Sequence, residues 1–542
     1  MSLTINTFFI KIKLKLQALA YCFSKQPLKY LVITSIVLIT VIKLNLMGSG
    51  FLTFPDEFRF FAAEQTLHDL SELKIGEAMT DIFSTKSKPG DVILSTIPNA
   101  IQQLTSYIFN LYTYESNNSY PLFIFNFIIY CFILIVHYKV SKLVLKDNFL
   151  ALLSVLLYSS LTNSYLYLRH VLAYDTSLLI FYLIIYKIFK YTKEDKLSFK
   201  ISVLIGIGSF FGYLVYPGYF PLFFLGLFLL FFNNLTKKNV FNKIYHSFYY
   251  ILGSIYCLLI FEGMSRLGGV SYISDALHAS SIVNQGSSEE SYTFIIKYLF
   301  EVEWVTGIIL IICIPLFCLI MLNQIRNKTF QQNSLIMLLG IGVFGLYLAY
   351  ASVGYFFNTL YLMGRSLHQY VPFICLFSLF SINMLLIKIT KKKDLVLFMI
   401  SLVFILNFGT NFIHYSSFSY PRDVYWKLNE TTNLSNIENI CEYVNGWSVS
   451  PDQTEIIDYS KFPVKAKTQP DTFVVTNCCF FYPVNDLTLY HKYTPDDSCK
   501  LIETKTHWLN FKAYQYEGIN ITERQIIDKI NFQIKIFSKS NI

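Results

Sequence analysis

Two adjacent acids near the start of the chain, Asp56 and Glu57, have the side chains and the position best suited to chemistry. They follow Pro55 and a long apolar run, and neighbouring carboxylates at a membrane surface are costly unless they are solvated, paired or used. A structural explanation is also open. Pro55 would fix a helix start, the helix dipole would favour Asp56 there, and Arg59 would be its partner at i+3.

Four basic residues form a second set of candidates, each close to the end of an apolar run: Lys88, Arg169, Arg266 and Arg365. Arginine suits a phosphate group because its planar fork donates two parallel hydrogen bonds. His368 follows Arg365 by one helical turn, so the two side chains would face the same way. The structural alternative for these cations is an anchoring position at the membrane interface.

Polar and aromatic residues beside these cations complete the candidate set. Asp175 lies just inside an apolar run, after Tyr174. An acid in that position usually forms an ion pair or takes part in function, and an ion pair with Arg169 is one alternative. Tyr216 and Tyr219 flank a Pro-Gly turn. Their rings would suit a sugar pocket, and an ordinary interfacial position is the alternative.

The composition indicates that membrane helices must position these residues. The 542-residue chain is 54% hydrophobic and only 15% charged, with a mean hydropathy of +0.45. Apolar runs of about 20 residues recur along it, which is the length needed to cross a bilayer. We therefore predict an all-α polytopic membrane protein with eleven spans, which begin near Tyr30, Pro121, Phe149, Val171, Phe199, Gly218, His246, Trp304, Ser334, Tyr370 and Leu395.

The charges of the loops predict the orientation of these spans. Lysine-rich loops alternate with lysine-poor ones, and the lysine-rich side is cytoplasmic by the positive-inside rule. The net charge of +9 is thus a topology signal, and nucleic-acid binding is not expected. The N-terminus would be cytoplasmic. The first loop and the tail would face outward, and the composition favours a bacterial inner membrane.

Residues 1–414 are expected to form the membrane domain, and two of its outward segments have structure of their own. In residues 48–120, apolar side chains recur at helical spacing from Asp56 to Leu70 and again from Val92 to Ile108, which predicts two amphipathic helices on the membrane surface. Residues 415–542 are predicted to form a small α/β or α+β domain, with strands at 472–476 and 487–491. A disulfide among Cys441, Cys478, Cys479 and Cys499 is plausible there, with no pairing assigned.

This topology brings acids and bases from separate outer segments to one membrane face, a combination that suits a phosphate-bearing substrate and a proton-accepting carboxylate. The pattern resembles the GT-C glycosyltransferases, integral membrane enzymes that use polyprenyl-phosphate-linked sugars, and among them the protein O-mannosyltransferases and lipid A aminoarabinose transferases. The matching positions are the acidic pair Asp56-Glu57 with Arg59, the motif Lys88-Pro89, the acid Asp175, and Arg365 with Pro372. The usual Lys-Pro-Pro appears here as Lys-Pro-Gly, and the tail matches no part of the family pattern.

The resemblance implies inverting transfer of a hexosyl or pentosyl group from a polyprenyl-phosphate donor to a glycan, lipid or protein acceptor. Asp56 would be the general base, supported by Glu57, and Lys88, Arg365, Arg169 and Arg266 would neutralise the leaving phosphate. Asp175, Tyr174, His368, Tyr216 and Tyr219 would position the donor or acceptor. Some members use a divalent metal ion, for which Asp56, Glu57 and Asp175 would be the ligands.

Three other functions are compatible with the same sequence. An O-antigen-type polymerase or ligase would rely on arginines in a late outer loop rather than on an early acidic pair. A transporter of solutes or lipid-linked sugars would show broken helices near the middle of the membrane. A structural scaffold would use its charged loops only for topology.

Overall fold

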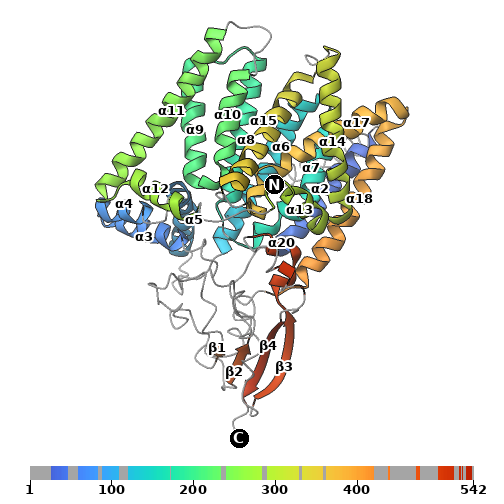
Figure 1. Ribbon diagram of the computed structural model, residues 1–542. Helices are drawn as coiled ribbons and strands as arrows, with labels where there is room; N and C mark the ends of the chain where they lie inside the picture. The colour runs from blue at the N-terminus through green and yellow to red at the C-terminus, as the bar shows by residue number, and fades with distance from the viewer. Residues whose placement is uncertain are drawn as a thin grey trace, which may run out of the picture.

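The computed structural model describes residues 26–46, 59–83, 88–108, 120–170, 172–232, 240–283, 290–328, 333–357, 362–419, 437–439, 472–476, 499–517, 524–525, 528 and 533–539. Figure 1 shows a bundle of long helices with a small sheet beyond one end of it, which we call the sheet end. Asp56, Glu57 and the expected strand at 487–491 lie outside the described residues.

The helices at the positions of the expected spans account for most of the bundle. They are α2 (Pro27–Lys43), α6 (Tyr120–Leu145), α7 (Asn148–Ser160), α8 (Tyr174–Lys193), α9 (Phe199–Val215), α10 (Phe220–Phe232), α11 (Val240–Leu267), α14 (Trp304–Arg326), α15 (Ser334–Phe357), α17 (Val371–Ile389) and α18 (Lys393–Ser416). Short 3₁₀ turns connect several of them: η1 (Leu44–Leu46), η3 (Thr162–Ser164), η4 (Leu166–Arg169) and η5 (Pro217–Tyr219).

Seven of the described helices are long and apolar enough to cross a membrane, so the chain is an integral membrane protein. They are Pro27–Leu46, Leu122–Leu145, Lys243–Leu267, Trp304–Arg326, Ser334–Phe357, Val371–Ile389 and Lys393–Ser416. The expected count of eleven spans is not confirmed. The other four expected spans are helical, but α9 and α10 are short, α8 carries Asp175 and three lysines, and α7 meets the following turns at 83°.

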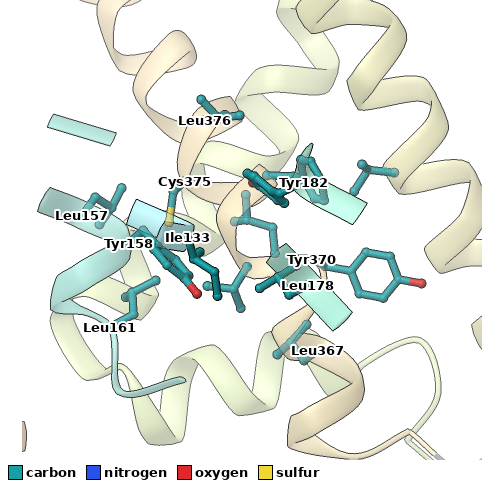
Figure 2. Close-up of a cluster of buried hydrophobic side chains, with 14 of the residues drawn as sticks. Ile133, Leu157, Tyr158, Leu161, Leu178, Tyr182, Leu367, Tyr370, Cys375 and Leu376 are labelled. Carbon is teal, nitrogen blue, oxygen red and sulfur yellow. The ribbon is translucent and has the colours of Figure 1, made fainter. Parts of the chain in front are cut away.

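The core is a continuous cluster of apolar side chains from helices that are far apart in the sequence. Figure 2 shows its centre, where Ile133 of α6, Tyr158 of α7, Leu178 of α8 and Cys375 of α17 meet. Cys375 is fully buried and, like Cys131, Cys257, Cys313 and Cys318, has a free thiol, as expected for packing residues.

The segment that follows the first span forms three short helices at the sheet end: α3 (Arg59–Ser71), α4 (Ile75–Phe83) and α5 (Pro89–Ile108). The first and third agree with the two helices predicted from apolar spacing, and α4 was not predicted. Met79 and Phe83 of α4 pack with Phe261 of α11 and Tyr272 in a second apolar cluster. Further short helices are α12 (Tyr272–Val283), α13 (Phe294–Val302) and α16 (Gly364–His368).

The described part of the tail contains a four-stranded sheet in the order β1-β2-β4-β3. The strands are β1 (Ile437–Asn439), β2 (Thr472–Thr476), β3 (Cys499–Thr506) and β4 (Gln533–Lys539); β1 and β2 are parallel and the other two pairs antiparallel. β2 confirms the strand predicted at 472–476. A separate outer domain remains a prediction, and part of the tail belongs to the bundle. Trp508 of η10 (Trp508–Asn510) and Tyr514 of α20 (Lys512–Gln515) are buried in the main core.

Candidate functional site

Lys88 reaches the rest of the candidate site because α5 begins in close contact with the end of α9. A Cβ atom on Gly90 would lie 2.8 Å from the backbone nitrogen of Val215, so glycine allows the two backbones to approach. This contact accounts for glycine as the third residue of the Lys-Pro-Gly motif. The Nζ atom of Lys88 lies 5.3 Å from the ring centroid of Tyr216, in cation–π range.

Tyr174 links Tyr216 to Arg365. The rings of Tyr174 and Tyr216 meet edge-on, with centroids 4.6 Å apart. The Nη1 atom of Arg365 donates a hydrogen bond of 3.0 Å to the Tyr174 hydroxyl oxygen. Two cations predicted from sequence, Lys88 and Arg365, are therefore joined through two tyrosines predicted from sequence. Lys88 is half-buried, and the Arg365 side chain is 12% exposed.

Asp175 and His368 form a buried pair beside Tyr174. The Nε2 atom of His368 lies 2.9 Å from Oδ1 of Asp175, and its Nδ1 atom lies 2.8 Å from Oδ1 of Asn163. The Asn163 amide nitrogen donates to Tyr298 and to the carbonyl of Gly364, so its oxygen accepts and Nδ1 of His368 carries a hydrogen. The hydrogen bond between Nε2 of His368 and Oδ1 of Asp175 then contains one proton, carried by the imidazole or by the carboxyl group.

This pairing shows where the Asp175 side chain lies in the folded protein. Its side chain is 3% exposed and His368 is completely buried. Asp175 is therefore engaged with histidine inside the protein, and the pair is suited to holding α8 and α16 together. Because Tyr174 and Arg365 are on the same two helices, the pair also positions the cation of the site.

Glu517 from the tail reaches this region, which the sequence did not predict. Its Oε1 atom accepts a hydrogen bond from the Tyr167 hydroxyl, and its Oε2 atom lies 3.8 Å from Nε of Arg365. The backbone N–H of Gly364 donates to the carbonyl of Tyr516 at 2.8 Å. A Cβ atom on Gly364 would lie 2.4 Å from the Glu517 carboxylate, so only glycine fits here without displacing it.

A second unpredicted acid, Glu303, stabilises the backbone where α7 ends. Its two carboxylate oxygens accept hydrogen bonds from the backbone N–H groups of Thr162, at 2.9 Å, and Asn163, at 3.0 Å. Burial raises the pKa of Glu303 to about 7, although these hydrogen bonds act in the opposite direction. Nearby, Lys43 donates to the Tyr130 hydroxyl and to Ser164. These contacts fix the turn that presents Asn163 to His368.

The remaining predicted residues differ in where they lie. Tyr219 is buried beside Tyr216, with ring centroids 4.9 Å apart. Arg266 is 65% exposed and pairs with Glu262, four residues earlier on the same helix, at 2.7 Å. It is not among the residues that Arg365 contacts in the described part of the chain. The backbone of Arg169 ends η4, and its side chain lies outside the described residues, as do Asp56 and Glu57.

The described residues do not contain three His, Cys, Asp or Glu side chains grouped to hold a metal ion. Asp175, one of the three predicted ligands, is turned toward His368. The other two, Asp56 and Glu57, lie outside the described residues. A divalent metal site therefore stays a prediction that depends on the acidic pair.

The site residues that were not predicted differ in how clearly the sequence indicates them. Glu303 directly precedes the apolar run that begins at Trp304, the same pattern that drew attention to Asp175. Glu517 has no such signal, since it lies in a polar tail 152 positions after Arg365. Asn163 and Tyr167 lie in what was predicted as part of a continuous apolar stretch.

No protein-family model, curated protein or solved structure matches this chain. Two cations joined through tyrosine rings can bind an anion next to a sugar, since the cations neutralise negative charge and the rings offer apolar faces.

Proposed function

We propose that this protein is a membrane glycosyltransferase that transfers a sugar from a polyprenyl-phosphate donor to an acceptor on the outer face of the membrane. One observation supports the proposal above all others. Lys88 and Arg365, which lie 277 positions apart in the sequence, are connected by Tyr216 and Tyr174 at the sheet end of the bundle. This pair of cations suits the phosphate, and the tyrosines suit the sugar.

In the proposed reaction the acceptor hydroxyl attacks the anomeric carbon from the side opposite the phosphate. The new glycosidic bond forms as the bond from the anomeric carbon to the phosphate oxygen breaks, and the configuration inverts. The hydroxyl proton passes to Asp56, a step that contributes roughly two to four orders of magnitude in rate. The electron pair leaves with the lipid phosphate, whose charge Lys88 and Arg365 stabilise.

The proposed setting is a bacterial inner membrane with the N-terminus cytoplasmic and the sheet end outside. The alternation of lysine-rich and lysine-poor loops supports this orientation. The donor would enter laterally from the outer leaflet, and the acceptor would be a glycan, lipid or protein.

The experiment uses the full chain in proteoliposomes with a panel of polyprenyl-phosphate sugars carrying radiolabelled hexoses or pentoses. Transfer of label to a product is expected, and Asp56→Asn is expected to remove it while the folded protein is still recovered. Glu72→Gln is the matched control, because Glu72 is an exposed acid of the same segment that pairs with Lys74.

Two outcomes would overturn parts of the proposal. Full transfer by Asp56→Asn would exclude Asp56 as the base. Uptake of label into the vesicles without formation of a product would favour a transporter.

A further inference from the structure

We propose that Glu517 is a positioning residue that holds Arg365 for the phosphate of the donor, so that the C-terminal segment completes the anion site of the membrane bundle. This inference rests on the proposed function, because it assumes that Arg365 binds a phosphate. It assigns a role to a part of the tail that the resemblance to GT-C enzymes does not cover.

The contacts of Glu517 are those of a residue that orients a cation. One carboxylate oxygen is held by the Tyr167 hydroxyl, and the other lies 3.8 Å from Nε of Arg365. The Tyr174 hydroxyl accepts a hydrogen bond of 3.0 Å from Nη1 of Arg365, and the Met363 sulfur accepts from Nε and Nη2. The rings of Tyr167 and Tyr174 also touch, with centroids 5.0 Å apart. Arg365 is therefore held by Tyr174, Met363 and Glu517, and Tyr167 contacts both Tyr174 and Glu517.

Because Glu517 is buried, its negative charge needs a compensating partner. Its side chain is only 10% exposed, and a buried carboxylate is costly unless it is paired and hydrogen-bonded. Burial raises the pKa of Glu517, whereas Arg365 and the Tyr167 hydroxyl act to lower it. Glu517 thus depends on Arg365 for compensation, and in return it restricts the guanidinium to one geometry.

The segment that carries Glu517 is itself fixed to the bundle. The Tyr516 ring packs on Tyr298, with centroids 5.3 Å apart. The guanidinium of Arg524 lies 4.2 Å from the centroid of the same Tyr516 ring. Arg524 in turn forms an ion pair with Glu290, which also pairs with Lys297. This second ion pair docks the tail through Arg524 rather than through the Glu517 carboxylate, so it provides a control for docking alone.

The test measures binding rather than transfer, with farnesyl monophosphate as the probe and uncharged farnesol as its reference. The full chain is reconstituted in nanodiscs of zwitterionic lipid. Glu517→Gln keeps the size of the side chain and removes its charge. It is expected to weaken binding of farnesyl monophosphate about tenfold, the scale of one charge-assisted hydrogen bond from Arg365 to the phosphate. Binding of farnesol is expected to stay unchanged.

Two variants separate positioning from simple docking of the tail. Glu290→Gln is expected to leave farnesyl monophosphate binding close to wild type, because it loosens the tail away from Arg365. Gly364→Ala places a Cβ atom against the Glu517 carboxylate and is expected to weaken binding as Glu517→Gln does. In the transfer assay, Glu517→Gln should raise the donor KM more than it lowers kcat, and Glu517→Asp should recover part of the loss.

Failure of this inference can be told apart from failure of the proposed function. If wild type prefers farnesyl monophosphate over farnesol and Glu517→Gln binds it equally well, the role of Glu517 is excluded and the anion site stands. Equal losses in Glu517→Gln and Glu290→Gln would also exclude it, in favour of a docking role. If wild type shows no preference for the phosphate, the anion site itself is excluded.

Discussion

Arg365 and Arg266 occupy similar places in the sequence, each at the end of an apolar run, but their surroundings differ. The Arg365 side chain is 12% exposed and contacts Tyr174, 191 positions away, and Glu517 of the tail. The Arg266 side chain is 65% exposed, and its partner Glu262 lies one turn back on the same helix. Among the described residues, the contacts of Arg365 come from distant parts of the chain and the ion pair of Arg266 is local.

The surroundings of Arg266 explain its local role. Glu262 also accepts hydrogen bonds from the Ser271 hydroxyl and the backbone N–H of Ile273, so it secures the turn from α11 into α12. An exposed i,i+4 ion pair contributes only about 0.3–0.5 kcal/mol. Residue type and distance from a span end therefore do not separate an arginine held by distant segments from one in a local ion pair, whereas the long-range contacts do.

Loss of Arg365 is expected to reduce activity much more than loss of Arg266 does. Arg365→Gln removes the charge and the hydrogen bond to Tyr174, and we expect sugar transfer to fall on the order of 100-fold, as for the loss of one donor to a developing negative charge. Arg365→Lys should recover little, because lysine lacks the planar fork. The measurement is kcat/KM with a polyprenyl-phosphate sugar, and near-normal transfer by Arg365→Gln would contradict the assignment.

The second prediction tests the Asp175–His368 pair, which joins the helices that carry Tyr174 and Arg365. His368→Leu leaves the buried Asp175 without its partner, and we expect the free energy of unfolding to fall by about 3 kcal/mol. Adding Asp175→Leu should recover part of that loss, since it removes the unpaired group. Thermal unfolding of both variants in detergent provides the measurement. A double variant that is less stable than the single one would argue against this coupling.

The third prediction concerns the helices that pack beside α11 near Arg266. Burial and the neighbouring Asp69 raise the pKa of Asp81 in α4 from 3.8 to about 6, with a further contribution from Glu77. Between these values the folded state holds the proton more strongly than the unfolded state does. The stability contributed by that proton is therefore present below about pH 4 and lost as the pH rises through about 6.

Asp81→Asn should mimic the protonated form at every pH. We expect it to raise the unfolding temperature by about 2 °C near pH 7.5 and to give no gain near pH 4. Thermal unfolding of the two proteins across this range checks the sign. A gain confined to acid pH would show that the shift has the opposite direction.

Substitution of Arg266 is expected to change activity and stability least. Arg266→Gln removes only an exposed local ion pair, and we expect kcat/KM and stability to stay within about twofold and about 0.5 kcal/mol of wild type. The same assays used for Arg365→Gln provide the measurement. A loss as large as that of Arg365→Gln would place Arg266 in the site after all.

Local pattern predicted much of the fold, because helical spacing and apolar length are properties of neighbouring residues. The helices from Arg59 and from Pro89, and the strand at 472–476, were found in this way. The number of spans was harder to predict. A run of apolar residues does not reveal that α7 ends at Ser160 and that the chain then turns by 83°, since the carboxylate of Glu303 that stabilises the turn comes from a distant segment.

Part of the candidate site followed from topology alone. Lys88 was expected in the first outer loop, and Asp175 and Arg365 at the outer ends of their spans; the contacts through Tyr216, Tyr174 and His368 connect all three. Their partners could not be predicted in that way. Nothing near Glu517 in the sequence points to Arg365. Asp175 has His368 as a partner, a contact that was not predicted because it depends on packing between helices, and the Arg169 side chain considered for it lies outside the described residues.

The contact between Glu303 and the end of α7 has a consequence for how the protein is made. The backbone N–H groups of Thr162 and Asn163 are satisfied by a carboxylate about 140 residues later in the chain. While the ribosome is still making the intervening helices, these two amides lack that acceptor. The turn after α7 therefore gains these two hydrogen bonds only after Glu303, at the start of α14, has been synthesised and lies beside it.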